Sequence, residues 1–324
     1  MAKAIEECGK NKSDTGFKCM RSGLGLYGES PGSVKQVVHD GDTIQVRALG
    51  NFSIRFLGVD TPEISFTLPG KETFTSIGDP GWQTFLDDPF KGAPVWDLPY
   101  NTELRSYLTG KIGQGCAANH HRHAQAAQRA LEGEIESDMK KLGQDRSSFR
   151  FFLAFAHDLM DGYGRLLAYV NVEQQEKPYP KPYQERLLEQ GLALPYFIWP
   201  NIDPFFSLLR KHRSLSDAVP KPGRMREEAF ASAKLKAARE AFAKAREEKR
   251  GVFEASDPLR LEPFELRFLA KQRLPDRWLI DLSWDSDELL PPRRYHLVRN
   301  PEDRLWVPAE YVPLFVERGW RRAC

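Results

Sequence analysis

The sequence is poor in cysteine, and the few that it has lack the spacings that would give them a structural use. Its 324 residues include only Cys8, Cys19, Cys116 and Cys324, and no two of these form a Cys-x-x-Cys pair. Neither a disulfide framework nor a structural zinc site is therefore expected.

Long apolar runs and an excess of one charge are also missing. No stretch approaches the ~20 apolar residues of a membrane span, and the opening MAKAIEECGKNKSD lacks the apolar core of a secretory signal. We therefore expect a cytoplasmic protein without a membrane partner. The 47 basic and 45 acidic side chains give a net charge of +2, so net charge by itself does not predict a polyanionic partner.

The sequence does contain a stretch in which apolar and polar residues alternate, as they do in half-buried strands. The second and third of its runs, residues 43–48 and 52–56, show this period, and the first run, residues 34–38, is expected to be a further strand. Gly50-Asn51 separates the second run from the third, and both residue types tolerate the positive φ angles of a two-residue hairpin turn. Asp40-Gly41 separates the first run from the second in the same way. The pattern predicts a three-stranded meander.

Acidic residues gather at the ends of this predicted meander. Asp42 opens one strand and the segment DTPE, residues 60–63, follows another, so the sequence places Asp42 and Asp60 at one rim. Two acids at one rim repel unless a cation lies between them, and oxygen ligands suit a hard ion such as calcium rather than zinc. Arg55 lies five residues before Asp60, on the opposite face of a regular strand, and Gly58 predicts the bulge that would bring both to one site.

Three segments resemble the signature of the staphylococcal-nuclease-like, or thermonuclease, family. They are HDGDT at 39–43, IRFLGVDTPE at 54–63 and DGYGRLLAYV at 161–170. The resemblance implies an α+β fold: a five-stranded OB-fold β-barrel with three helices. It covers residues 34–63 and 149–201, and more loosely the helix that ends near Phe253.

The resemblance also implies roles for single residues. Asp42, Asp60 and the Thr61 carbonyl match the family's calcium ligands, Arg55 and Arg165 match its two phosphate-binding arginines, and Glu63 matches its proposed general base. The implied activity is a calcium-dependent nuclease that hydrolyses phosphodiester bonds of DNA and RNA by metal-assisted attack of water. The alternative is a nuclease-like module that binds nucleic acid or a protein without catalysis. The presence of all five charged side chains favours the enzyme.

Two tyrosines are candidates for substrate contacts. Tyr163 precedes Arg165 by two residues and would flank the substrate, with an ordinary packing role as the alternative. Tyr196 lies in LALPYFIWPN, which resembles the family segment whose tyrosine lines the nucleotide pocket. Stacking on tyrosine accepts any base, although so aromatic a run is equally typical of a hydrophobic core.

The chain is expected to have three parts: an N-terminal segment at 1–33, the nuclease-like domain at 34–256 and a C-terminal α+β module or strap at 257–324. The domain carries an insertion at 64–118 after its third strand. This insertion is either a substrate lid or specificity loop beside the active cleft, or a surface addition. Its aromatic residues are expected to pack it: Trp82, Phe85, Phe90, Trp96 and Tyr100. The C-terminal module is a candidate for binding a protein partner.

Helices and one further hairpin complete the prediction. Helices are expected from an Asn119 N-cap, from Tyr183 to a Gly191 stop, from Asp203-Pro204, and at 224–250; strands at 150–156 and 165–170 form the hairpin.

His120 and His123 are one turn apart, which is compatible with a metal site but more typical of a solvated first turn or a phosphate contact. The helix at 224–250 has nine basic and five acidic side chains, and its polar face either attracts a phosphate backbone or is merely solvated.

Overall fold

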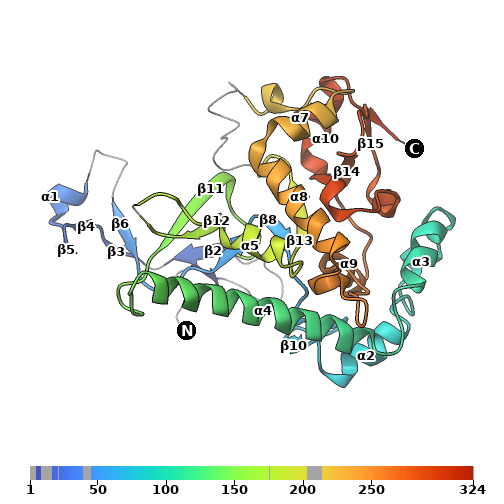
Figure 1. Ribbon diagram of the computed structural model, residues 1–324, viewed down its shortest axis with the longest axis horizontal. Coiled ribbons are helices and arrows are strands. Elements are labelled where there is room, and N and C mark those ends of the chain that lie inside the picture. The colour runs from blue at the N-terminus through green and yellow to red at the C-terminus, as the bar shows by residue number, and fades with distance from the viewer. Residues whose placement is uncertain are drawn as a thin grey trace. The chain divides into compact units, whose positions relative to one another are not determined.

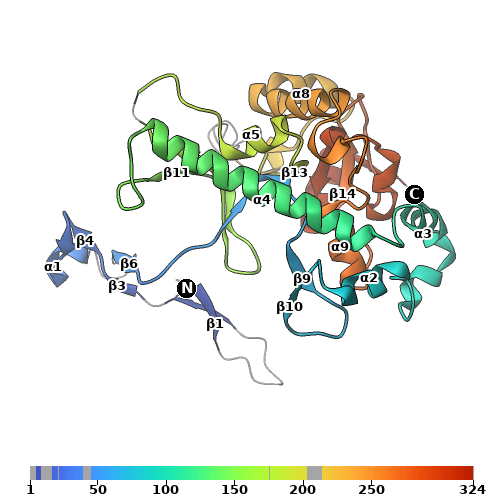
Figure 2. The ribbon, with the colours of Figure 1, turned by 60° about the horizontal axis from the view of Figure 1, so that its bottom comes forward.

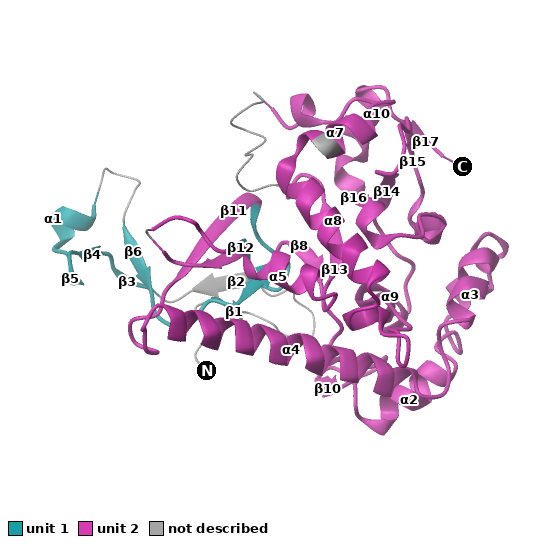
Figure 3. Cartoon of the chain, in the orientation of Figure 1, with its two compact units in different colours: residues 1–55, 158–168 teal, residues 56–157, 169–324 magenta. Residues whose placement is uncertain are grey.

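A computed structural model describes residues 5–8, 17–20, 22–38, 45–174, 176–202 and 214–323. The chain divides into two compact units, one formed by residues 1–55 and 158–168 and the other by residues 56–157 and 169–324 (Figure 3). Both helices and strands occur along the chain, which makes it a mixed α+β protein. None of the helices in the described ranges combines the length and apolar character that a membrane crossing requires.

The smaller unit contains short antiparallel pairs. β1 (Ile5–Cys8) pairs with β2 (Phe17–Met20), β3 (Ser22–Leu24) with β6 (Val46–Ala48), and β4 (Leu26–Tyr27) with β5 (Ser30–Pro31). Exposed apolar side chains are frequent here, including Leu26, Tyr27, Val34 and Val46. Little of this unit's apolar surface is therefore buried within it.

The predicted meander is wrong in two respects. Val34–Val37 is a helical turn, α1, because the Gln36 side chain accepts a hydrogen bond from the Ser33 N–H and so caps the turn. β6 pairs with β3, whereas β7 (Ile54–Phe56) belongs to a sheet with the order β11-β12-β7. The second and third runs are therefore not hairpin partners, and the Asp40-Gly41 turn lies outside the described residues.

The later hairpin is confirmed. β11 (Phe151–Met160) and β12 (Leu166–Val172) are neighbours in their sheet, and both strands cross from one unit into the other. The Asp161 N–H donates to the Arg165 carbonyl at 2.9 Å, which closes the predicted turn.

The larger unit is organised around a four-stranded sheet with the order β14-β16-β13-β8. Its strands are β8 (Gly58–Asp60), β13 (Leu194–Ile198), β14 (Trp278–Asp281) and β16 (Arg304–Val307). β13 pairs antiparallel with β8 on one side and parallel with β16 on the other. The predicted boundary between 256 and 257 therefore does not coincide with a unit boundary, because strands from both sides of it share this sheet. Nor do the described strands form a closed five-stranded barrel.

Figures 1 and 2 show the helices that the larger unit contains within its described residues. They are α2 (Pro80–Asp87), α3 (Thr102–Thr109), α4 (Cys116–Lys141), α5 (Tyr183–Glu189), α7 (Met225–Ala231), α8 (Ala233–Glu247), α9 (Pro263–Ala270) and α10 (Val312–Glu317). α5 and its Gly191 stop, with φ of 68°, are confirmed. The helix predicted from Asp203-Pro204 lies outside the described residues.

Two predicted helix boundaries are wrong. α4 begins at Cys116 rather than at an Asn119 cap, and Asn119 is buried, donating from Nδ2 to Asp257 Oδ1 at 2.8 Å. The helix predicted at 224–250 is split at Ser232, whose hydroxyl accepts from the Leu235 N–H and starts α8. Serine competes with helical hydrogen bonding at interior positions, which explains why the split occurs there.

The insertion packs into the larger unit as expected. Besides α2 and α3 it contains β9 (Ser65–Thr67) and β10 (Phe74–Ser76), which pair antiparallel. Trp82, Phe90 and Trp96 are buried in one hydrophobic cluster with side chains of α9 and β16, whereas Tyr100 is exposed. A second cluster joins α5, α8, β13 and α10. The remaining short strands, β15 (Glu288–Leu289) and β17 (Arg321–Arg322), pair in parallel.

Candidate functional site

The acidic segment DTPE begins where β8 ends. Asp60 is the last residue of β8 and lies opposite Leu194 of β13. Gly58 starts the strand with φ of 77°, in the left-handed region that favours glycine, and a Cβ there would lie 3.1 Å from the Tyr169 hydroxyl. The irregular backbone that the sequence predicted at Gly58 is therefore present.

Both predicted acids of this segment bind one arginine that the sequence did not single out. Arg267 of α9 donates from Nη2 to Asp60 Oδ2 at 2.7 Å and from Nη1 to Asp60 Oδ1 at 2.9 Å. Its Nη1 also donates to Glu63 Oε1 at 2.7 Å. The two acids thus share one guanidinium, which forms the forked pair that arginine makes with carboxylates.

This group of three side chains is largely removed from water. The Asp60 side chain is 1% exposed, that of Arg267 18% and that of Glu63 21%. Burial acts to lower the pKa of Arg267, but Asp60 and then Glu63 outweigh it and hold that pKa well above its ordinary value. Arg267 therefore stays charged.

A buried histidine positions the backbone of Glu63. The Glu63 N–H donates to His120 Nε2 at 2.9 Å, so this ring nitrogen is unprotonated. Burial lowers the pKa of His120 from 6.5 to about 3. His123 is also buried, with Nε2 2.7 Å from the Asp257 carbonyl oxygen. The prediction of a solvated first turn is therefore wrong, since both rings serve internal contacts.

The low pKa of His120 predicts acid sensitivity. The ring takes up a proton near pH 6.5 in the unfolded chain but only near pH 3 in the folded one. The unfolded state therefore binds more protons between these values, and the free energy of unfolding should fall as the pH drops through this window. The slope due to this residue approaches about 1.4 kcal/mol per pH unit.

The variant His120→Gln tests this expectation. A glutamine carbonyl can accept the Glu63 N–H but does not titrate, so the free energy of unfolding of the variant should vary less with pH. Urea unfolding of both proteins between about pH 7 and pH 4 gives the comparison. Parallel curves would assign the acid sensitivity to other groups.

The predicted phosphate-binding arginines belong to the other unit. Arg165 donates from Nε to Asp161 Oδ2 at 2.7 Å, and its backbone N–H donates to Asp161 Oδ1 at 3.0 Å. Its guanidinium lies 5.3 Å from the ring centroid of Tyr163, which is exposed. Arg55 is the middle residue of β7 and is partly buried.

The predicted set of site residues is thus distributed over both units. Arg55, Tyr163 and Arg165 lie in one unit, and Asp60, Thr61, Glu63 and Tyr196 lie in the other. Asp42 lies outside the described residues.

Tyr196 has the packing role that was the alternative prediction. It is 9% exposed and its ring lies against Phe264 and Trp306, with centroids 6.0 and 5.5 Å apart. Its hydroxyl accepts a hydrogen bond from Arg277 Nη1. The ring is therefore held within the core of the larger unit.

The described residues do not fit a calcium ion at Asp60. Calcium would need the carboxylate oxygens of Asp60 as ligands, and both oxygens accept from Arg267. Within the described ranges, no group of three or more His, Cys, Asp or Glu side chains is arranged to hold a metal ion.

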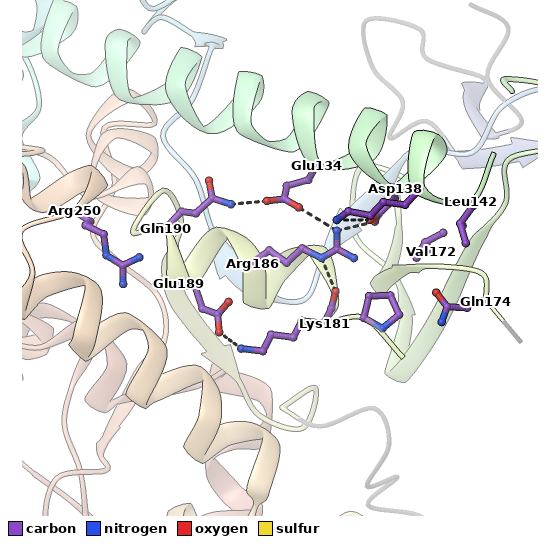
Figure 4. A pocket seen from close by; sticks show the side chains of 12 residues that line it. Glu134, Asp138, Leu142, Val172, Gln174, Lys181, Arg186, Glu189, Gln190 and Arg250 are labelled. Atoms are coloured by element: carbon purple, nitrogen blue, oxygen red, sulfur yellow. Dashed lines mark hydrogen bonds and ion pairs between the residues drawn. The ribbon is translucent and has the colours of Figure 1, made fainter. Parts of the chain in front are cut away.

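A separate polar pocket lies between α4 and α5, with a cavity volume of about 480 Å³ (Figure 4). Arg186 donates to Asp138 Oδ2 at 2.6 Å and to Glu134 Oε2 at 3.1 Å, and Gln190 also binds Glu134. Lys181 pairs with Glu189 at its rim. Most of its charges are thus paired with one another, and Arg250 pairs with Glu248 outside the pocket, which is typical of a structural ion-pair network.

Arg267 could have been suspected from one local signal. It is the only cation in the stretch PFELRFLA, where Glu265 is the one other charged residue, and a charge on a largely apolar helix needs a partner. The sequence does not identify that partner. No protein-family model matches this chain, and no curated protein matches it either.

Proposed function

We propose that this chain is a phosphodiesterase of the staphylococcal-nuclease-like type that acts on DNA or RNA, with the OB-fold barrel of that family. The main support is that the side chains of Asp60 and Glu63, the acids of the DTPE motif, come close together where β8 ends. The order of HDGDT, DTPE and DGYGR along the chain adds to it.

The residues present can supply the chemistry of phosphodiester cleavage. Attack on phosphorus places negative charge on the equatorial oxygens, and arginine side chains stabilise this charge through forked hydrogen bonds. Arg55 and Arg165 are the proposed phosphate ligands. Glu63 is the proposed base, because its side chain is partly exposed and can accept a proton from water. In the family calcium would supply further positive charge, with Asp42, Asp60 and Thr61 as its ligands; because Asp60 does not fit the ion here, no step is assigned to it.

The alternative is a nuclease-like module that binds nucleic acid or a protein without cleaving it. The observation that favours it is that Asp60 and Glu63 are engaged by Arg267, and Arg165 by Asp161. Internal ion pairs of this kind also occur at purely structural sites. A protein partner of residues 257–324 would be compatible with either function.

A cleavage assay on single-stranded DNA, with and without calcium, separates the two functions. Removing one donor to the developing charge typically costs about 10²- to 10³-fold in rate, so Arg165→Ala should lower cleavage by this factor while retaining the fold. Binding of the same DNA without cleavage by the wild type would favour the alternative. Equal cleavage by Arg165→Ala and wild type would remove Arg165 from the site.

A further inference from the structure

The guanidinium of Arg267 holds the carboxylate oxygens that a calcium ion at Asp60 would need as ligands. Its Nη1 and Nη2 take both oxygens of Asp60, and Nη1 also takes Oε1 of Glu63. A calcium ion would bind such oxygens at about 2.3–2.6 Å, so the ion and the guanidinium cannot occupy this position together. The planar fork of arginine matches a carboxylate geometrically.

Burial makes an exchange between Arg267 and an ion costly. Asp60 is almost fully enclosed and Arg267 is only 18% exposed on its side chain. If an ion displaced the guanidinium, that buried charge would lose both carboxylates, and an unpaired buried charge is strongly unfavourable.

Packing also prevents Arg267 from moving aside with its helix. Phe264, Leu266, Phe268 and Leu269 of α9 are buried in the cluster that includes the insertion. The start of α9 is fixed as well, because Glu262 accepts from Arg304 Nη1 at 2.7 Å and Glu265 accepts from Lys111 Nζ at 2.5 Å. α9 therefore belongs to the hydrophobic core rather than to a mobile strap.

We propose that Arg267 is the permanent counter-ion of Asp60 and Glu63, in the place of a divalent cation. The acids of the DTPE segment then bind no calcium in the folded protein, and the positive charge at this site is supplied by the chain itself. Only the relevance of this ion pair to cleavage rests on the proposed function. The pairing itself is independent of activity.

Calcium titration of the whole chain, followed by calorimetry and by Tm, tests the proposal. For the wild type we expect no calcium binding at Asp60. Calcium should cause no rise in Tm that the substitution Asp60→Asn abolishes. Arg267→Met, which keeps an apolar stem but removes the charge, should acquire a calcium-dependent rise in Tm. The additional substitution Asp60→Asn should abolish that rise.

Calcium binding by the wild type that disappears in Asp60→Asn would overturn the proposal, even if the protein cleaves DNA. A protein without nuclease activity that shows the expected calcium behaviour would instead refute only the proposed function. If Arg267→Met does not fold, the charge-free variant Arg267→Met/Asp60→Asn/Glu63→Gln decides. Its folding supports the counter-ion role, and its failure to fold would assign Arg267 a packing role and overturn the proposal.

Discussion

Glu63→Gln is expected to slow phosphodiester cleavage by about 10²- to 10⁴-fold, the usual effect of losing a general base. The amide cannot take a proton from water, but its carbonyl oxygen can still accept the hydrogen bond that Arg267 Nη1 donates to Glu63 Oε1. The loss should therefore be one of rate and not of structure. Initial rates on single-stranded DNA, together with circular dichroism spectra, measure both.

Glu72→Gln is the matched control, because Glu72 lies in the insertion that follows Glu63 and is exposed. It should cleave at the wild-type rate. A Glu63→Gln protein that cleaves as fast as this control would show that another group activates the water.

Arg267→Ala is expected to lower the free energy of unfolding by about 3–5 kcal/mol, the usual result of removing one partner of a buried ion pair. The variant removes the guanidinium from which both oxygens of the buried Asp60 carboxylate accept hydrogen bonds in the wild type. Urea unfolding measures the change, with equal m-values showing that the same folded state is compared. The double variant Arg267→Ala/Asp60→Asn should be more stable than Arg267→Ala, because it no longer buries the negative charge of Asp60.

Arg321→Ala provides the control for this experiment. Arg321 binds both oxygens of Asp287 with the same forked geometry, but its side chain is 65% exposed. Water can replace that pair, so the control should change stability far less. An equal loss in both variants would mean that burial does not decide the strength of the Arg267 pair.

Local patterns predicted the elements that local interactions determine. The hairpin around Asp161-Gly162 and the helix stopped by Gly191 are present because turn and cap residues act on their immediate neighbours. The same reasoning fails at Val34–Val37, where a segment expected to be a strand forms a capped helical turn. So short a run fits both the helical and the strand period, and the cap between Ser33 and Gln36 favours the helix.

Contacts between distant segments could not be predicted in this way. Arg267 follows Asp60 by 207 residues, and no pattern in either segment specifies the other. The pairing of β16 with β13 is likewise parallel and long-range, so no turn marks it in the sequence. The sequence therefore predicted a cation between Asp42 and Asp60, but not that Arg267 of α9 would bring a positive charge to Asp60.

The position of β13 between β8 and β16 has a practical consequence for shortened forms of the protein. A chain cut after residue 256 would retain β13 and lose β16, which would leave one edge of β13 with bare N–H and C=O groups. Such edges recruit strands of other molecules. Trimming the protein to residues 1–256 should therefore yield self-associating material.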